Sequence, residues 1–207
     1  MKIGIVGAGN IGANAARLFV RAGHEVALSN SRGPESLGDL VAELGDAARA
    51  ASVEEAARFG DVVLLAAPWR TREAVPPAEL LAGKIVVDAM NPYREDFTLY
   101  DLGDSTSSEE VAKRLPGARL VKAFNTIFFE HLAEEGRTDL PDGERRAIFV
   151  AGDDAEAKAV VSRLIEEIGF APVDTGSLRE GGRRQQPGTD IYNRQITGDA
   201  ARKILAG

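Results

Sequence analysis

Three glycines near the start of the chain constrain its fold more than any other feature. Gly7, Gly9 and Gly12 lie between a mostly apolar run at 2–6 and a helix-forming run at 13–20. In such a strand–loop–helix unit, the first glycine permits a tight turn, the second lets a pyrophosphate approach the backbone, and the third lets the helix pack closely on the strand. The helix dipole favours negative charge at this position. The segment predicts a dinucleotide site, although an ordinary strand-to-helix turn is the alternative.

The residues after the second predicted strand, 24–28, indicate which dinucleotide binds. An NAD-preferring site carries Asp or Glu there, whereas this chain has Ser29, Asn30, Ser31 and Arg32. No carboxylate would repel a 2′-phosphate, and the serine hydroxyls and the guanidinium can donate hydrogen bonds to one. We therefore expect NADP(H) rather than NAD(H), with a purely structural polar turn as the alternative.

Length and composition exclude several other classes of protein. The 207 residues include no cysteine and only two histidines, which lie far apart, so thiol chemistry is excluded and a protein-held metal is not expected. The net charge of −7 argues against nucleic-acid binding. The chain has neither a membrane-spanning apolar run nor the pattern of a signal peptide. We expect a cytoplasmic protein with one domain over 1–207 and no membrane contact.

Strand and helix patterns alternate along the chain, which predicts an α/β fold with a doubly wound, mostly parallel Rossmann sheet of about eight strands. The predicted strands cover 2–6, 24–28, 47–51, 61–66, 84–88, 119–123, 146–151 and 171–174. The predicted helices cover 13–20, 34–44, 53–59, 107–115, 128–135 and 154–168, with a proline-interrupted crossover at 71–81. The expected helix caps are Ser52 (with Glu55 in a capping box), Ser107 or Ser108, and Asp153.

Ligands of such sheets bind beyond the carboxyl ends of the strands. There Trp69 could cover the nicotinamide or a substrate ring, or it could pack on the crossover helix. Asn91 and Asn125 could hydrogen-bond the cofactor or serve the turns in which they lie. Lys122, inside a predicted strand, is interpreted as a solubilising edge residue rather than a base.

The predicted strand ends carry little acid–base chemistry. The chain has no Tyr-x-x-x-Lys sequence, and neither histidine follows a predicted strand end. Reduction of a carbonyl ordinarily needs a proton donor, whereas hydride exchange between two redox cofactors mainly needs their rings to be stacked. The sequence therefore favours transfer between cofactors, and no residue is assigned as catalytic.

Four segments, 7–12, 29–32, 67–69 and 150–154, together resemble the family of NADP oxidoreductases that use the deazaflavin coenzyme F420. The resemblance runs from residue 1 to about residue 176 and implies a small single-domain Rossmann protein. It implies that the glycine loop holds the pyrophosphate, that Ser31 and Arg32 hold the 2′-phosphate, and that residues 125–127 line the nicotinamide side. The candidate cofactor-binding residues are Gly7, Ala8, Gly9, Asn10, Ile11, Ser29, Asn30, Ser31, Arg32, Ala67, Pro68, Trp69, Asn91, Asn125, Thr126 and Ile127.

Two departures from the family pattern leave the hydride acceptor open. Asn125 stands where archaeal members carry a histidine, and the polar stretch 178–188 replaces an apolar C-terminal helix. The arginines of this stretch could bind an anionic coenzyme tail or face solvent, and 177–195 could form a mobile lid. We expect a homodimer whose small-molecule redox partner is coenzyme F420 or a flavin. The alternatives are an NADPH-dependent reductase of a small carbonyl or imine, and a non-catalytic NADP(H)-binding module that senses redox state.

Overall fold

The computed structural model describes the side chains of residues 1–71 and 75–207. Its centre is one eight-stranded sheet with the order β3-β2-β1-β4-β5-β6-β7-β8. The strands are β1 (Lys2–Val6), β2 (Glu25–Ser29), β3 (Ala48–Ala50), β4 (Val62–Leu65), β5 (Ile85–Asp88), β6 (Arg119–Lys122), β7 (Ala147–Gly152) and β8 (Ala171–Gly176). All neighbouring strands pair in parallel except β6 and β7, which are antiparallel. The predicted doubly wound, mostly parallel sheet is confirmed.

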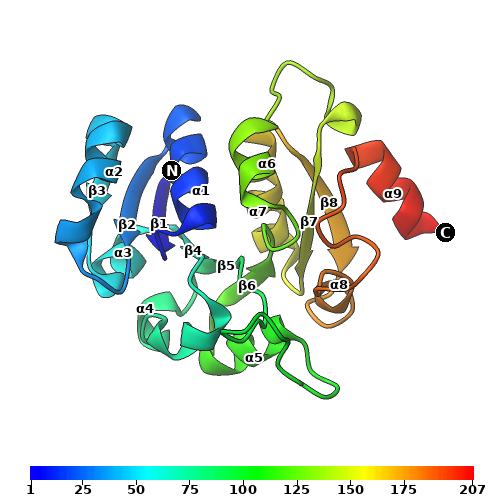
Figure 1. Ribbon diagram of the computed structural model, residues 1–207, viewed down its shortest axis with the longest axis horizontal. Coiled ribbons are helices and arrows are strands. Elements are labelled where there is room, and N and C mark those ends of the chain that lie inside the picture. The colour runs from blue at the N-terminus through cyan, green and yellow to red at the C-terminus, as the bar shows by residue number, and fades with distance from the viewer.

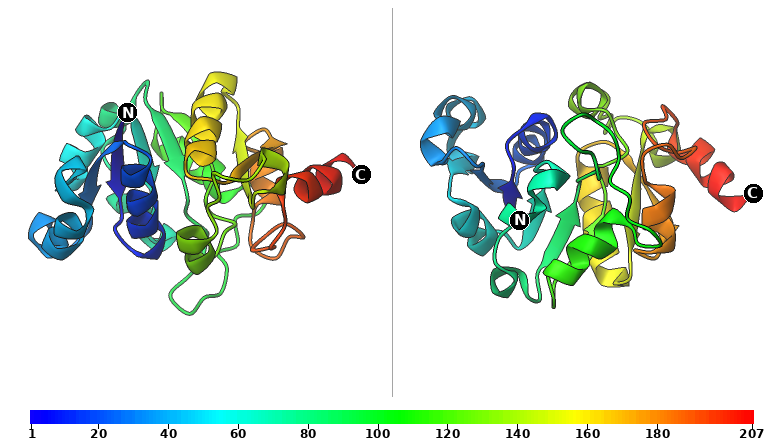
Figure 2. Two further views of the ribbon diagram at one scale, coloured as in Figure 1. Left: turned by 90° about the horizontal axis from the view of Figure 1, so that it is seen from above. Right: turned by 60° about the horizontal axis from the view of Figure 1, so that its bottom comes forward.

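Helices cover both faces of the sheet (Figures 1 and 2). They are α1 (Asn10–Arg21), α2 (Gly38–Leu44), α3 (Val53–Phe59), α4 (Ala78–Leu81), α5 (Ser107–Arg114), α6 (Phe129–Glu134), α7 (Ala155–Glu167), α8 (Glu180–Arg184) and α9 (Gly198–Ala206). Four short 3-10 helices join them: η1 (Pro34–Leu37), η2 (Gly45–Ala47), η3 (Trp69–Ala74) and η4 (Asp142–Glu144). The predicted crossover at 71–81 contains α4, while the side chains of 72–74 lie outside the described residues.

The core has two main layers because side chains alternate between the faces of a strand. In β4, Val62 and Leu64 point into the layer covered by α1, α6 and α7, whereas Val63 and Leu65 point into the layer covered by α4 and α5. Strands β4, β5 and β7 are buried along their whole length, which explains why their sequences are mostly continuous apolar runs rather than alternating ones. No helix within residues 1–71 and 75–207 has the length and apolarity to cross a bilayer.

The cap of α5 differs from the prediction. Thr106 caps the helix, in place of Ser107 or Ser108: its hydroxyl accepts a hydrogen bond from the Glu109 amide at 3.1 Å. The Glu109 carboxylate accepts in return from the Thr106 amide at 2.8 Å. The reciprocal pair of a capping box, with Glu three residues after the cap, decides the start of the helix.

The caps of α3 and α7 give one confirmation and one correction. Ser52 caps α3 and forms the predicted capping box with Glu55. Asp154, rather than Asp153, caps α7 by accepting from the Ala157 amide at 2.9 Å. Asp153 instead accepts from the Leu178 amide at 2.9 Å, and so holds the connection that leaves β8.

The C-terminal part of the chain contains a helix that the sequence analysis did not predict. Helix α9 begins at its cap, Thr197, and lies at the β8 end of the sheet, away from β3 (Figure 1). Its buried Ala201 packs with Phe149 of β7, Val173 of β8 and Ile191. The segment 177–195, which contains α8, therefore runs between β8, the last strand of the sheet, and α9, which packs against β7 and β8.

Candidate functional site

A cleft of about 680 Å³ lies beyond the carboxyl ends of β1, β2, β4 and β5. The structure brings together in its lining most of the residues that the sequence predicts: Gly7, Ala8, Gly9, Asn10, Ile11, Asn30, Ser31, Arg32, Ala67, Pro68, Trp69 and Asn91. It places four others outside the lining: Ser29, Asn125, Thr126 and Ile127. All four of these are buried.

The glycine loop has the geometry that a pyrophosphate needs. Gly7 has a φ of +104°, and a Cβ at Gly12 would lie 1.8 Å from the Gly7 carbonyl oxygen, so both positions require glycine. A Cβ at Gly9 would meet nothing within 4 Å, and this space opens at the start of α1. Within the described part of the chain, no side chain caps α1. Its first amide groups are thus available to an anionic ligand.

The polar residues of the turn after β2 have two roles: some stabilise the turn, and others line the cleft. Ser29 is fully buried, and its hydroxyl donates to the Ile5 carbonyl at 3.0 Å, so it holds β2 against β1. Asn30 shapes the turn by accepting from the Arg32 amide at 2.8 Å. Ser31 and Arg32 are exposed and line the cleft. Their hydroxyl and guanidinium can therefore meet an anionic group at the β2 end.

Trp69 packs into the core and so holds the connection after β4 in place. Its side chain is 2% exposed and belongs to the core layer that includes Leu81 of α4. The ring of Tyr100 lies 5.1 Å away between centroids. Trp69 also forms part of the cleft lining, so the structure shows the packing that we expected as one alternative and leaves contact with a ring ligand as a prediction.

Hydrogen bonds join the ends of β5 and β6 to the C-terminal segment. Asn91 donates to the Asn125 carbonyl at 2.8 Å and to the Tyr192 hydroxyl at 3.1 Å. Asn125 donates to Asn91 Oδ1 at 3.1 Å and to the Gln185 carbonyl at 2.8 Å. The Tyr93 hydroxyl donates to that of Tyr192 at 3.4 Å, and burial raises the pKa of Tyr192. Both asparagines thus support the site structurally, and Asn91 also reaches the cleft.

Lys122 is a buried ion-pair partner, and its interpretation as a solubilising edge residue is wrong. Strand β6 lies inside the sheet, and the Lys122 side chain is 1% exposed. Its ammonium lies 3.0 Å from Asp88 Oδ2 and also donates to the Met90 carbonyl. Asp88 accepts in addition from the Ser108 hydroxyl at 2.7 Å and from the Met90 amide at 2.9 Å. Burial lowers the pKa of Lys122, and Asp88 opposes this shift. The pair fixes Met90, which lines the cleft.

Phe97 is a cleft residue that sequence reasoning missed. It lies in the connection between β5 and α5, where its side chain is 81% exposed and its φ is +62°. An amide-to-carbonyl hydrogen bond of 2.8 Å from Arg94 to Thr98 closes the turn around it. Such a backbone is uncommon for a residue other than glycine and needs support from its surroundings. The one sequence signal was an aromatic residue flanked by polar residues, Asp96 and Thr98, in the irregular stretch after β5.

The glycine loop, the polar turn after β2 and the cleft at the strand ends define a dinucleotide-binding protein with the Rossmann fold. Residues 2–92 match the model of the family described as NADP oxidoreductase, coenzyme F420-dependent. The match bears out, over these residues, the family resemblance predicted from the sequence, and it covers under half of the 207-residue chain.

Similar proteins extend the match beyond residue 92. A hypothetical protein from Sinorhizobium meliloti has 34% identity and a TM-score of 0.82, and the match covers 95% of both chains. A candidate F420-dependent NADP reductase from Arthrobacter sp. FB24 has 28% identity and a TM-score of 0.73, over 88% of this chain and 89% of that one. Metalloreductase STEAP3 of Rattus norvegicus is 33% identical over 178 residues, and the match covers 86% of this chain. The chain spans only 34% of the length of this curated relative.

Proposed function

We propose that this protein transfers hydride between NADP(H) and coenzyme F420 or a flavin. The observation that carries the proposal is the layout of one cleft, in which an exposed arginine after β2 and aromatic side chains after β4 and β5 line opposite ends. Strands β1 and β4 lie between β2 and β5 in the sheet. At about 4.8 Å per strand, the two ends are about 14 Å apart, a span that suits an extended dinucleotide.

Each part of the cleft has a separate task under this proposal. The open side of Gly9 and the first turn of α1 hold the pyrophosphate, while Ser31 and Arg32 bind the 2′-phosphate. The nicotinamide supplies the hydride when bound, at the β4–β5 end. There Tyr93 and Phe97 offer aromatic surface, which suits the flat ring of a deazaflavin or flavin. The residues position two rings against each other, and orientation supplies most of the rate acceleration.

One observation favours a second candidate function, the reduction of a small carbonyl or imine. Tyr93 lines the cleft, and its hydroxyl donates to the Tyr192 hydroxyl at 3.4 Å. A tyrosine beside the nicotinamide could donate the proton that such a reduction needs.

Anaerobic turnover of NADPH with a panel of acceptors tests the proposal. The panel is coenzyme F420, FMN, FAD, a small ketone and a cyclic imine, each also assayed with NADH. We expect reduction of F420 or a flavin, a preference for NADPH, and retention of this activity in Tyr93→Phe. Turnover confined to the ketone or imine and lost in Tyr93→Phe would favour the second function. Tight NADPH binding without any turnover would favour a redox-sensing module.

The homodimer and the cytoplasmic location expected from the sequence stay predictions. Light scattering coupled to size-exclusion chromatography, with and without NADPH, tests the subunit number directly.

A further inference from the structure

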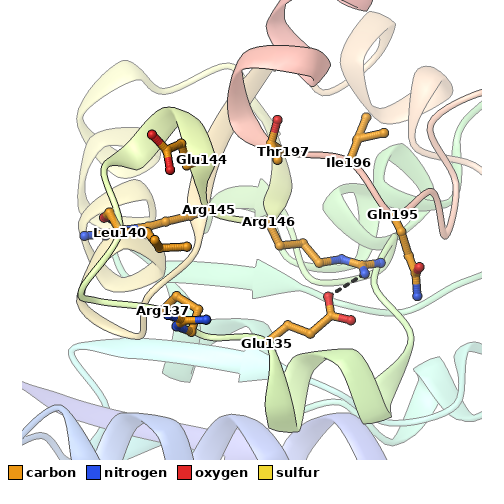
Figure 3. Close-up of a pocket in the computed structure, with 9 residues that line it drawn as sticks. All are labelled: Glu135, Arg137, Leu140, Glu144, Arg145, Arg146, Gln195, Ile196 and Thr197. Carbon is orange, nitrogen blue, oxygen red and sulfur yellow. Dashed lines mark hydrogen bonds and ion pairs between the residues drawn. The ribbon is translucent and has the colours of Figure 1, made fainter.

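A second cavity, of about 260 Å³, lies at the β7–β8 end of the molecule and shares no lining residue with the cleft. Its walls come from three segments, the end of α6 with the residues after it, the connection from η4 into β7, and the residues ahead of α9 (Figure 3). The side chain of Arg146 extends among these residues, with its guanidinium between Glu135 and Gln195 (Figure 3). This cavity is therefore a separate site from the cleft that the dinucleotide would occupy.

Arg146 is a buried cation that is only partly satisfied. Its side chain is 6% exposed, and Nη1 donates to Glu135 Oε2 at 2.6 Å. Its Nε and Nη2 atoms are buried and have no hydrogen-bond partner among the residues that the structure describes. The backbone fixes its position, because Arg146 forms a β-bridge with Thr197 and accepts from the Ala171 amide at 2.8 Å. Buried guanidinium N–H groups without a partner are costly, so a ligand that accepts from them would be favoured.

The two donors of Arg146 without a partner, Nε and Nη2, form the edge of the guanidinium with which other arginines of this chain bind carboxylates. Three other arginines each bind both oxygens of one carboxylate through Nε and Nη2, at 2.5–2.9 Å: Arg17 with Glu43, Arg119 with Asp154, and Arg137 with Asp139. The two N–H bonds of that edge are parallel and match the spacing of two carboxylate oxygens. In Arg146 the same pair of donors is left over beside a cavity.

The charges around the cavity suit a single negative charge on the ligand. Arg145 donates to the carbonyls of Leu140, Glu166 and Thr138 at 2.8–3.2 Å, so its positive charge is held in place by neutral groups. Glu144 also lines the cavity, and it would repel a dianion more strongly than a monoanion. Ile196 supplies apolar wall for a short hydrocarbon tail.

We propose that this cavity binds a small monocarboxylate, held through both oxygens by Nε and Nη2 of Arg146. The apolar tail of the ligand lies against Ile196, on the same side of the cavity as the guanidinium (Figure 3), and Gln195, which is exposed, moves to admit it. The proposal is independent of the hydride-transfer function, since the cavity and the cleft have no residue in common.

Titration of ¹⁵N-labelled protein with propionate, followed by the arginine Nε–Hε correlations, tests the proposal. The signal of Arg146 should shift and saturate, while those of Arg17, Arg119 and Arg137 should stay, because their Nε groups already bind a carboxylate. Inorganic phosphate is the second titrant. The proposal is overturned if propionate does not shift the Arg146 signal at lower concentration than the signals of the three paired arginines. It is also overturned if only phosphate shifts the Arg146 signal.

Variants locate the site and control for folding. Arg146→Gln should weaken propionate binding by roughly 10- to 100-fold, the effect of losing charged hydrogen bonds. Because this change removes the arginine partner of Glu135 and leaves only the contact of Glu135 with His131 Nδ1 at 2.6 Å, the double variant with Glu135→Gln is prepared in parallel and should show the same loss. Arg137→Gln is the matched control: Arg137 lines the same cavity but is paired with Asp139, so binding should change by no more than about twofold. Unchanged propionate binding in the folded double variant would refute the site, and NADPH binding should be the same in all variants.

Discussion

At the scale of single residues, we propose that the choice between the two nicotinamide dinucleotides depends on Arg32, the exposed cation at the β2 end of the cleft. Arg32→Ala should weaken NADPH binding by about 1.5–3 kcal/mol, because charged hydrogen bonds to the 2′-phosphate are lost. NADH binding should change little, since NADH lacks that phosphate. Titration calorimetry with both nucleotides measures the difference. Arg21→Ala, an exposed arginine outside the cleft, is the control, and equal losses for NADPH and NADH would contradict this role of Arg32.

Lys122 carries a stability prediction. Lys122→Met leaves Asp88 buried without its cation and should cost about 3–5 kcal/mol of unfolding free energy. Urea denaturation measures the loss, and the double variant with Asp88→Asn should recover part of it. Lys113→Met removes an exposed partner of Glu110 on α5 and should cost no more than about 1 kcal/mol. If Lys122→Met proves no more destabilising than Lys113→Met, the buried pair contributes nothing.

These residues also show which features of the site the sequence could predict and which it could not. The place of Arg32 and of the glycine loop in the cleft could be predicted, because it depends on neighbours within a few residues. The partner of Lys122, Asp88, is 34 residues away and becomes a neighbour only through the strand order. The unpaired edge of Arg146 and the exposure of Phe97 likewise depend on packing that no local pattern encodes. Asn125 follows a strand as predicted, but the C-terminal segment covers it and keeps it out of the cleft lining.

At the scale of elements, the start of α1 allows two glycines to be tested against each other. Gly9→Ala should leave stability unchanged, because the added methyl meets nothing within 4 Å. It should nevertheless weaken NADPH binding by about tenfold, or 1.4 kcal/mol, because the methyl group occupies the approach of the pyrophosphate. Gly12→Ala places a methyl 1.8 Å from the Gly7 carbonyl oxygen and should cost about 1–3 kcal/mol of stability. Thermal unfolding and nucleotide titration separate the two effects; unchanged NADPH affinity in Gly9→Ala would count against the pyrophosphate position.

The junction of β6 and α7 predicts a pH dependence. Arg119 binds both oxygens of Asp154, the cap of α7, at 2.5 and 2.9 Å. This pairing holds the pKa of Asp154 below its ordinary value of 3.8. A lowered pKa in the folded state stabilises the fold above the ordinary carboxyl pKa, and this contribution is lost as the pH falls through the lower folded value.

Asp154→Asn isolates the charge, since Asn caps helices about as well as Asp. The variant should be less stable than the wild type at pH 7, and the difference should shrink as the pH falls below about 4. Chemical denaturation over that range measures it. A difference that is independent of pH would show that the Asp154 charge does not contribute.

At the scale of the whole molecule, the chain folds its last part back over the ends of the central strands. The ends of β1, β2, β4 and β5 supply the cleft, while α9 packs on β7 and β8. The segment 177–195, between β8 and α9, returns to the ends of β5 and β6. There the Tyr192 hydroxyl accepts a hydrogen bond from Asn91, and the Asn193 amide donates to the Thr126 carbonyl at 3.0 Å. The fold class was predictable because strand and helix patterns alternate locally. This return was not, because its contacts join residues 60 to 101 positions apart.

Removal of the Tyr192 hydroxyl tests whether the segment 177–195 acts as a lid. Tyr192→Phe breaks its hydrogen bonds to Asn91 and Tyr93 and should cost about 0.5–1.5 kcal/mol of stability. If the segment opens to admit the acceptor, hydrogen exchange of the Asn193 amide should become faster, and KM for the acceptor should change while the Kd of NADPH stays the same. Tyr100→Phe, in the loop beside the cleft, serves as a comparison variant. Unchanged exchange at Asn193 together with an unchanged KM would contradict a lid, because loss of the hydrogen bonds that join the segment to the strand ends would then neither open it nor affect the acceptor.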